Sequence, residues 1–256
     1  MRDETALVTG AAGGIGEAVV RALAAEGVAV AAVDANAEAL NTLVKELSEA
    51  GHRVRGFVAN VASSAEVDAM VERAERELGP IGYLVNAAGV LRVGAGASLS
   101  DDDWDTTFAV NATGVFRVSR AVANRMIPRG SGAIVTLASN AARTPRWNMA
   151  AYAASKAAAT SFTKCLGLEL AKHGIRCNVV APGSTDTPML TSLWNGGDAL
   201  RISIEGAPET FRVGIPLGRL ARPADIADAV LFLLSDRAAH ITLQDLTVDG
   251  GAALGN

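Results

Sequence analysis

Short apolar runs alternate with longer amphipathic runs along nearly the whole chain. The apolar runs are four to seven residues long and rich in Val, Ala, Leu and Ile, which is typical of strands buried on both faces of a parallel sheet. These runs predict strands at Ala6–Thr9, Val28–Val33, Val54–Val58, Ile81–Val85, Ala133–Ala138, Ile175–Ala181 and Leu243–Val248. The intervening runs predict helices at Glu17–Glu26, Glu38–Ala50, a run after the N-cap candidate Ser63, Leu99–Met126, Ala157–Ala171 and Pro223–Leu234.

The regular alternation of strand and helix predicts an α/β protein with a Rossmann-type, doubly wound, parallel seven-stranded sheet flanked by helices. The expected strand order is 3-2-1-4-5-6-7, within a single domain over residues 1–256. Residues 184–212 lack a clear period, and we expect them to form a mobile segment that covers the site. Sites in such sheets lie beyond the carboxyl ends of the strands, where the chain places Asp34, Asn86, Ser139 and Pro182.

Composition and charge restrict the possible functions. Of the 256 residues 50% are hydrophobic and only 4% aromatic, so the core must be mostly aliphatic. The net charge of −4 comes without a basic cluster, and nucleic acid and anionic membranes are therefore poor partners. No apolar run approaches the ~18 residues that span a bilayer, and the first residues lead straight into a strand, which leaves no room for a signal peptide. Cys165 and Cys177 indicate neither a disulfide framework nor a metal cluster, so we expect a cytoplasmic protein without a metal.

A glycine-rich turn, Gly-x-x-x-Gly-x-Gly, joins the first strand to the first helix. Such a turn lets the backbone approach a pyrophosphate, and the helix N-terminus adds free N–H groups and a positive dipole end. The candidate cofactor residues of this turn are Gly10, Gly14, Ile15 and Gly16. A plain tight turn is the alternative, but the context of strand, glycines and helix favours nucleotide binding.

Asp34 ends the second predicted strand, eighteen residues after Gly16. That spacing is close to the ~20 residues expected for an acid that binds the ribose 2′-hydroxyl of a dinucleotide. A carboxylate there repels a 2′-phosphate, and no Arg or Lys follows before Lys45, so NAD is favoured over NADP. The alternative is that Asp34 caps the helix that starts near Asn36. Further along, the third strand ends at residues 60–61, and Asn60 and Val61 are candidates to border the adenine ring.

The stretch between Ser139 and Lys156 contains the candidate catalytic groups. Tyr152 and Lys156 are four residues apart, which places both side chains on one face of a helix. A lysine ammonium one turn away stabilises a phenolate and lowers the pKa of the tyrosine, so that it can take a proton from an alcohol. Ser139 ends a predicted strand and can hold the substrate oxygen beside Tyr152. Taken alone, the Tyr–Lys pair favours an ordinary helix surface, because such pairs are common on helices.

In this order and spacing, the motifs together resemble the short-chain dehydrogenase/reductase family over nearly the whole chain. The matching residues are Thr9–Gly16, Asn86–Gly89, Asn111, Ser139, Tyr152, Lys156 and Pro182–Gly183. The resemblance implies a catalytic tetrad in which Tyr152 is the acid/base and Ser139 positions the reacting oxygen. It also implies that Lys156 lowers the tyrosine pKa and binds the nicotinamide ribose, while Asn111 holds a water that relays protons.

The same resemblance implies further contacts with the cofactor. Thr187, five residues after Pro182, stands where the family contacts the nicotinamide carboxamide. Asn60 departs from the aspartate that is usual at its position. The remaining residues expected to bind NAD are Asn86, Ala87, Gly89, Tyr152, Lys156, Pro182, Gly183 and Thr185.

A closer resemblance, over most of residues 81–255, is to members of the family that act on a cyclic dihydrodiol carboxylic acid. It rests on Asn86–Arg92, Thr144–Arg146, Arg176–Val180, Gly183–Thr187, Gly214–Gly218 and His240–Asp245. It implies NAD-linked oxidation of one ring alcohol to a ketone, which then tautomerises to an aromatic diol. The ring substituents stay open, because an amine in place of one hydroxyl fits the same reaction.

A benzoate-like substrate requires a cation for its carboxylate. Arg92 follows the segment Asn86–Gly89, and Arg143 and Arg146 lie on the loop before Tyr152. A guanidinium can bind a carboxylate with two parallel hydrogen bonds, and we expect Arg146 to be the first choice. For each arginine alone a solvated loop position is favoured, because charged residues are mostly exposed, but we expect at least one of the three to bind the carboxylate. Met149, with Trp147, is a candidate for an apolar wall against the ring.

Two other hypotheses remain at this point. The chain is either another member of the family, such as a 3-oxoacyl reductase or a sugar-alcohol dehydrogenase, or a non-catalytic nucleotide-binding regulator on the same fold. Asp34 argues against an NADPH-dependent reductase, and the complete tetrad argues against a regulator. From the resemblance we also expect a homotetramer, which associates through the helices of Asn111 and Tyr152 and through the C-terminal strand.

Overall fold

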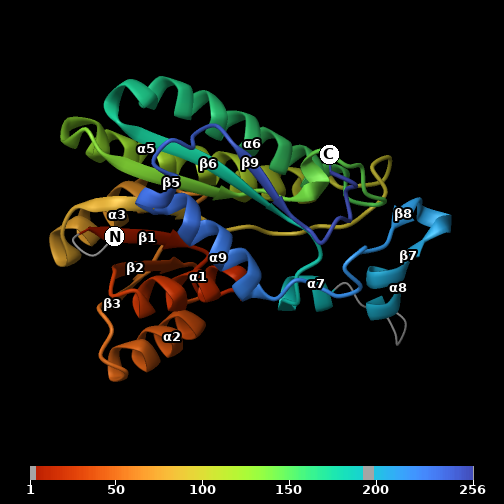
Figure 1. Cartoon of the computed structure of the whole chain (residues 1–256), viewed down its shortest axis with the longest axis horizontal. Coiled ribbons are helices and arrows are strands. Elements are labelled where there is room, and N and C mark those ends of the chain that lie inside the picture. The colour runs from red at the N-terminus through yellow and green to blue at the C-terminus, as the bar shows by residue number, and fades with distance from the viewer. Residues whose placement is uncertain (1–3, 193–198, 256) are drawn as a thin grey trace.

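The centre of the molecule is one parallel seven-stranded sheet (Figure 1). The computed structural model describes residues 4–192 and 199–255. The strand order β3-β2-β1-β4-β5-β6-β9 confirms the predicted order, because β9 is the seventh strand of this sheet along the chain. The strands are β1 (Thr5–Thr9), β2 (Ala29–Asp34), β3 (Val54–Val58), β4 (Ile81–Asn86), β5 (Gly132–Leu137), β6 (Ile175–Pro182) and β9 (Asp245–Val248).

Helices cover both faces of the sheet, as the doubly wound prediction requires. One face carries α1 (Gly14–Ala25), α2 (Ala37–Glu49) and α9 (Pro223–Leu234). The other carries α3 (Ser64–Leu78), α5 (Val115–Met126) and α6 (Ala150–Leu170). Short 3₁₀ turns lie at Ile127–Arg129, Asn140–Ala142, Ala171–His173, Pro208–Thr210 and Asp236–Ala238.

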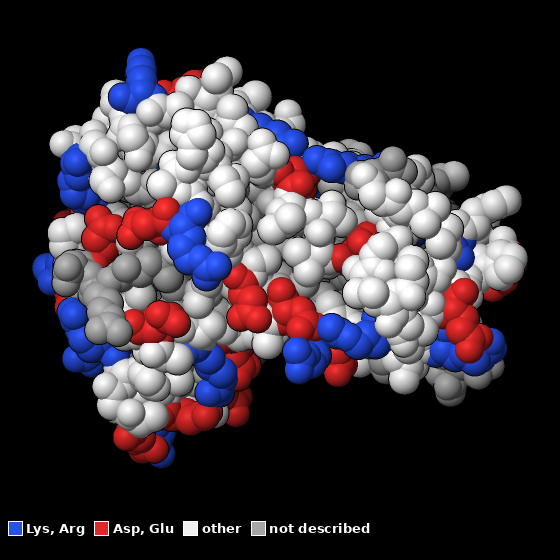
Figure 2. Space-filling model, viewed as in Figure 1, with Lys and Arg blue, Asp and Glu red and all other residues white. Residues whose placement is uncertain are grey.

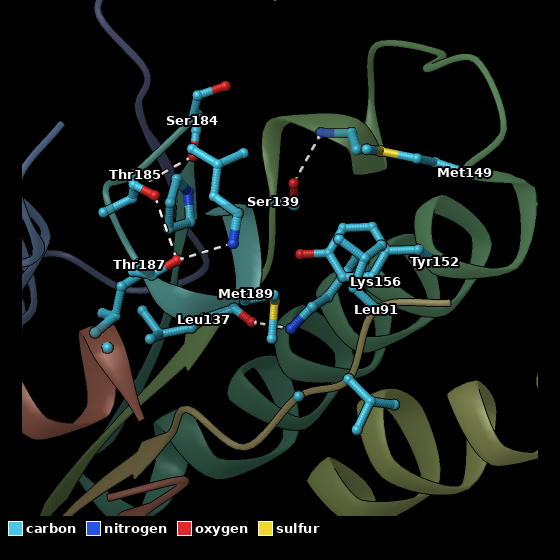
Figure 3. A pocket seen from close by; sticks show the side chains of 18 of the residues that line it. Leu91, Leu137, Ser139, Met149, Tyr152, Lys156, Ser184, Thr185, Thr187 and Met189 are labelled. Carbon is cyan, nitrogen blue, oxygen red and sulfur yellow. Dashed lines mark hydrogen bonds between the residues drawn. The ribbon is translucent and has the colours of Figure 1, made fainter. Parts of the chain in front are cut away.

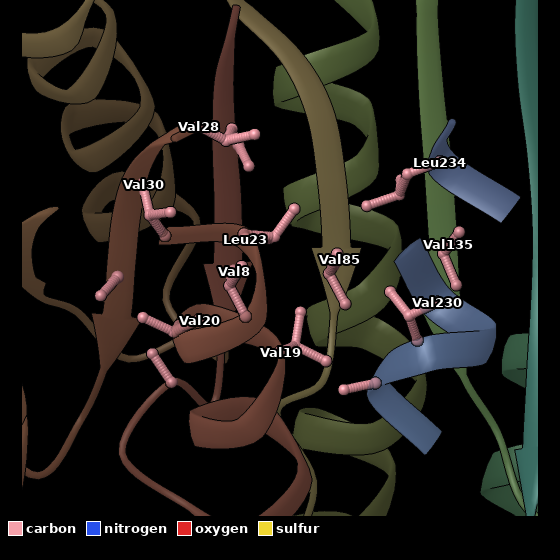
Figure 4. Packing of buried hydrophobic residues seen from close by; sticks show 14 of the residues in the cluster. Val8, Val19, Val20, Leu23, Val28, Val30, Val85, Val135, Val230 and Leu234 are labelled. Carbon is pink, nitrogen blue, oxygen red and sulfur yellow. The ribbon is translucent and has the colours of Figure 1, made fainter. Parts of the chain in front are cut away.

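Aliphatic side chains fill the space between α1, α9 and the central strands (Figure 4). Val19 and Leu23 of α1 and Val230 of α9 pack over the strand valines Val8 and Val85, and all five are fully or almost fully buried. Burying one such side chain contributes roughly 1.5–3 kcal/mol. This packing fixes α1, and with it the glycine turn that precedes α1, against the end of β1.

Side chains at the helix starts confirm the cap predicted at Ser63 and contradict the alternative considered for Asp34. Ser63 caps α3 by accepting a hydrogen bond from the Glu66 N–H at 3.4 Å. The cap of α2 is Asn36, whose side chain accepts from the Ala39 N–H, and not Asp34. The carboxylate of Asp34 therefore does not cap α2.

The helix predicted over Leu99–Met126 is interrupted. It consists of α4 (Asp101–Phe108), a π-type turn (Ala109–Gly114) and α5. Gly114 lies so close to Val61 that a Cβ at this position would be 2.8 Å from a Val61 methyl group. The π-type turn places Asn111 in the protein interior, and such turns are frequent at functional sites.

Residues 184–212 form short elements beyond the carboxyl ends of the strands, at the right of Figure 1. These are α7 (Pro188–Thr191), α8 (Ala199–Glu205) and an antiparallel pair of β7 (Gly206–Ala207) with β8 (Arg212–Val213). Residues 193–198 of this segment lie outside the described residues. The location fits a cover over the site, whereas its mobility stays a prediction.

The surface charge can be followed on one face of the molecule. On the face drawn in Figure 2, acidic and basic side chains are interspersed. Within residues 4–192 and 199–255, no helix combines the length and the apolar character needed to cross a membrane.

Candidate active site

A cavity of about 890 Å³ lies beyond the carboxyl ends of the strands and is covered by the segment that follows β6. Its lining brings together most residues that the sequence predicted for cofactor, catalysis and substrate. These are Gly10, Gly14, Ile15, Gly16, Asp34, Asn60, Val61, Ala87, Gly89, Ser139, Arg146, Met149, Tyr152, Lys156, Pro182, Gly183, Thr185 and Thr187. Segments far apart in the sequence therefore build one site, as the topology of the sheet predicts.

The glycine turn is packed too closely to accept side chains. Gly10 has φ of 65°, and a Cβ there would lie 2.7 Å from the Ala88 backbone. A Cβ on Gly16 would collide with the Gly10 carbonyl, and one on Gly14 would lie 2.6 Å from the Thr187 methyl group. The N-cap Gly13 also provides no side chain to cap α1. The first-turn N–H groups of α1 are thus left for an anion such as a pyrophosphate.

Asp34 lines the same cavity at the end of β2. Its two carboxylate oxygens accept hydrogen bonds from the Ala12 N–H at 3.0 Å and the Asn36 N–H at 2.9 Å. These bonds fix the carboxylate while leaving further lone pairs for a ribose hydroxyl. The described cationic residues of the cavity, Lys156 and two arginines, come from α6 and from segments after β5 and β6, away from β2.

Ser139, Tyr152 and Lys156 meet between the end of β5 and the first turns of α6. Figure 3 shows the Tyr152 hydroxyl pointing toward Ser139, with the Lys156 side chain on the same helix. The Ser139 hydroxyl oxygen accepts from the Ala141 N–H at 3.1 Å, which fixes its position. Lys156 Nζ donates to the Leu137 carbonyl at 2.8 Å and lies 5.9 Å from the centre of the tyrosine ring.

The pKa values of this group differ from the prediction that Lys156 lowers the pKa of Tyr152. Burial raises the pKa of Tyr152, and the opposing effect is a hydrogen bond with Ser139. Burial lowers the pKa of Lys156 to about 8. The reason for the difference is that Lys156 points its ammonium to the Leu137 carbonyl rather than to the phenolic oxygen.

Asn111 lies outside the described lining of the cavity and contacts Ser155 of α6, the helix that also carries Tyr152 and Lys156. Both hydrogens of its side-chain amide are donated, to the Val90 carbonyl at 2.9 Å and to the Ser155 hydroxyl at 3.0 Å. Its oxygen accepts from the Val90 N–H at 2.8 Å. These bonds hold the chain after β4 against α6, and the role of Asn111 toward a relay water stays a prediction. Gly89 leaves room for the Lys156 side chain, because a Cβ at position 89 would lie only 3.3 Å from Lys156 Nζ.

Asn86 also lies outside the described lining of the cavity, and its contact with the cofactor stays a prediction. Its side chain is buried below the cavity and donates to the Ser119 hydroxyl at 2.9 Å and the Thr136 hydroxyl at 3.3 Å. It ties β4 to β5 and α5, and Ala87 and Gly89, which follow it, form the cavity wall.

Two of the three candidate arginines also lie outside the cavity. Arg92 is exposed and faces Asp103, with Nε to Oδ1 at 3.7 Å. Arg143 Nη2 pairs with the buried carboxylate of Asp245 in β9 at 2.7 Å. The predicted substrate role is corrected for both, because one is oriented to solvent and the other is engaged in a structural ion pair.

Arg146 and Met149 line the cavity as predicted, and the structure adds Arg212. Arg212 lies on β8 and donates from Nη2 to the Ser184 hydroxyl at 2.9 Å. The sequence analysis missed it because it falls in the irregular segment, where no period or motif predicts side-chain direction. Arg212 lines the cavity only because the segment that carries it folds over the site.

The sequence model of the short chain dehydrogenase family matches residues 4–197, and the chain belongs to this family. It is an oxidoreductase of a family that uses a nicotinamide cofactor. The chain is 58% identical over 250 residues to a 2,3-dihydro-2,3-dihydroxybenzoate dehydrogenase of Bacillus subtilis, covering 98% of this chain and 96% of that protein. It is 47% identical to the protein of the same name from Escherichia coli, over 97% and 96% of the two chains.

Solved structures agree with this membership. A variant of the actinorhodin polyketide ketoreductase with NADPH superposes with a TM-score of 0.90 at 38% identity, covering 99% of each chain. A gluconate 5-dehydrogenase of Burkholderia cenocepacia in complex with NADP and tartrate also gives a TM-score of 0.90, at 33% identity over 99% and 96% of the chains. The fold therefore accommodates different substrates, and the choice among them depends on the residues of the site.

Proposed function

We propose that the protein oxidises 2,3-dihydro-2,3-dihydroxybenzoate to 2,3-dihydroxybenzoate with NAD, in siderophore or related secondary-metabolite biosynthesis. The identities of 58% and 47% to dehydrogenases of that name, over nearly the full length of the chain, support the proposal. The single structural observation that carries it is Arg146, a half-buried cation in the same cavity as Ser139 and Tyr152. A guanidinium there suits a carboxylate on the ring that is oxidised.

The chain offers a fitting site for NAD. The glycine turn and the N-terminus of α1 bind the pyrophosphate. Asp34 binds the adenosine ribose, and Lys156 binds the nicotinamide ribose. Val61 and Asn60 border the adenine, and Thr187 borders the carboxamide. Bound NAD supplies the acceptor for the hydride that leaves the ring carbon.

Proton transfer in the proposed reaction belongs to Tyr152. The deprotonated hydroxyl accepts the proton of the substrate alcohol while Ser139 holds the same oxygen by a hydrogen bond. The positive charge of Lys156 favours the phenolate in this step. The resulting ring ketone tautomerises to the aromatic diol, and aromatisation makes the overall reaction strongly favourable.

Asp34→Ala is expected to narrow the preference for NAD over NADP. In the unmodified protein NAD should bind at least about tenfold more tightly, because the carboxylate repels a 2′-phosphate at a site without an adjacent described cation. Titration of both cofactors against the unmodified and variant proteins measures the change. Equal affinity for NAD and NADP in the unmodified protein would contradict the assignment of Asp34.

The substrate proposal is tested by comparing the acid with a neutral cyclohexadiene diol that lacks the carboxylate. We expect kcat/KM to favour the acid by one to two orders of magnitude, the value of a charge-assisted hydrogen bond. Turnover of both at the same kcat/KM would remove the argument from Arg146. The amine-substituted analogue, a dihydro-hydroxyanthranilate, belongs in the same panel because it presents the same carboxylate.

A ketoacyl reductase is the second candidate function. The chain is 41% identical over 256 residues to a putative ketoacyl reductase of Streptomyces coelicolor. Asp34 disfavours the NADPH that a reductase of this kind would use, and Arg146 has no evident role toward a neutral ketone. A non-catalytic nucleotide-binding protein is the alternative of another class, and measurable NAD-dependent turnover excludes it.

We also propose that the protein is a cytoplasmic homotetramer with the segment 184–212 as a mobile cover. Phe116 of α5 and Leu168 of α6 are exposed apolar residues on neighbouring helices, and Phe116 contacts Phe162 with ring centres 5.7 Å apart. Burying this apolar area against another copy is favourable. Light scattering at micromolar concentration should give about four times the mass of one chain, and a monomer would contradict the proposal.

A further inference from the structure

Two arginines from separate segments line the part of the cavity that the cofactor motifs do not account for. Arg146 belongs to the loop that leads into α6, and Arg212 belongs to β8 of the covering segment. Trp147 and Met149 line the cavity beside Arg146, while Val213 and Ile215 line it beside Arg212. The arginines therefore stand among apolar side chains, in surroundings that suit an aromatic acid.

Neither arginine has an ion-pair partner within 4.0 Å among the described residues. Arg146 Nη2 donates only a long hydrogen bond of 3.4 Å to the Ala252 carbonyl, and Arg212 donates to the Ser184 hydroxyl. The charge of Asp249 raises the pKa of Arg146, against the larger effect of burial, which lowers it. The Asp249 carboxylate already accepts from the Asn140 amide at 3.0 Å and from the Gly251 N–H at 2.9 Å.

The electrostatic situation of this pair is unfavourable without an anion. Burial lowers the pKa of both guanidinium groups, and the charge of Arg146 lowers the pKa of Arg212 further. Arginine stays charged under these conditions, so two like charges face one partly desolvated space. Glu209 also lines the cavity, but it is exposed and lies beyond ion-pair distance of both. A bound carboxylate would relieve the repulsion and use the unpaired N–H donors.

We propose that Arg212 acts together with Arg146 as a two-arginine site for the substrate carboxylate, and that this pair sets the preference for cyclic carboxylic acids. The inference rests on the proposed function for the identity of the acid, but its ligand chemistry is a monocarboxylate on a six-membered ring. Because Arg212 is on β8, the acid also links the covering segment to the loop before Tyr152.

The test measures binding of salicylate and of its neutral amide, salicylamide, by calorimetry with NAD present. We expect Arg212→Gln to weaken salicylate binding roughly 10- to 100-fold and to leave salicylamide and NAD binding unchanged. Arg146→Gln should do the same. Arg212→Lys should recover part of the loss, because it restores the charge without the planar pair of donors. Arg92→Gln, an exposed arginine outside the cavity, is the matched control and should change nothing.

The possible outcomes separate this inference from the proposed function. Unchanged salicylate affinity in Arg212→Gln, or an equal loss for salicylate and salicylamide, overturns the two-arginine site. If the unmodified protein binds no salicylate, the site is likewise overturned. If Arg212→Gln raises KM for the dihydrodiol acid with kcat unchanged, both proposals stand. If salicylate binding depends on Arg212 while no dihydrodiol acid is turned over, the site stands and the proposed function fails.

Discussion

Tyr152→Phe is expected to lower turnover about 10²–10⁴-fold, which is the usual scale for the loss of a catalytic acid/base. The substitution removes only the hydroxyl that points toward Ser139 and keeps the ring, so the packing around it should persist. NAD affinity should therefore stay nearly unchanged. Steady-state turnover and NAD titration of the same preparation separate the two effects.

Tyr83 provides the matched control, since it is the other of the two tyrosines in the chain. It lies on β4, outside the described lining of the cavity, and burial raises its pKa to about 12. Tyr83→Phe should leave turnover within a few-fold of the unmodified protein. A Tyr152→Phe variant that keeps more than a tenth of the activity would mean that another group takes the proton.

Lys156→Ala is expected to lower turnover about 10²–10³-fold, as for other losses of a preorganised donor, and to weaken NAD binding as well. The pH profile identifies the cause. The lowered pKa of Lys156, about 8, marks the pH at which this group loses its positive charge. Because that charge favours the phenolate of Tyr152, kcat/KM for oxidation in the unmodified protein should show an inflection near pH 8.

In Lys156→Ala the inflection near pH 8 should disappear. The remaining activity should rise only at higher pH, because burial raises the pKa of Tyr152. Lys164→Ala is the control on the same helix, because Lys164 faces Asp245 at 3.9 Å and does not line the cavity. An unchanged pH profile in Lys156→Ala would argue against coupling between the two catalytic groups.

The fold followed from the sequence because its determinants are local. Each strand is a continuous aliphatic run, and the run Val54–Val58 matches β3 residue for residue. Alternation with helices then leaves few topologies that obey right-handed crossover. The π-type turn at Ala109–Gly114 was missed because it depends on tertiary contacts of Asn111 and Gly114, which no periodic pattern encodes.

The cofactor part of the site was predictable for a similar reason, because its glycines follow the end of β1 and Asp34 ends β2. The part of the site expected to bind the substrate was not predictable in this way. Arg143 and Arg146 are three residues apart, yet one pairs with Asp245, about a hundred positions away in sequence, and the other lines the cavity. Arg212 shares the cavity with Arg146 only because the covering segment folds back over the site.

The most direct measurement mixes the purified protein with NAD and 2,3-dihydro-2,3-dihydroxybenzoate and quantifies NADH and the aromatic product of the same reaction. NADH absorbs in the near ultraviolet, and the catechol acid is followed separately by chromatography of the quenched sample. The account predicts one aromatic product for each NADH formed, with the reaction running essentially to completion. NADH formation without the aromatic diol, or no turnover with NAD at all, would contradict it.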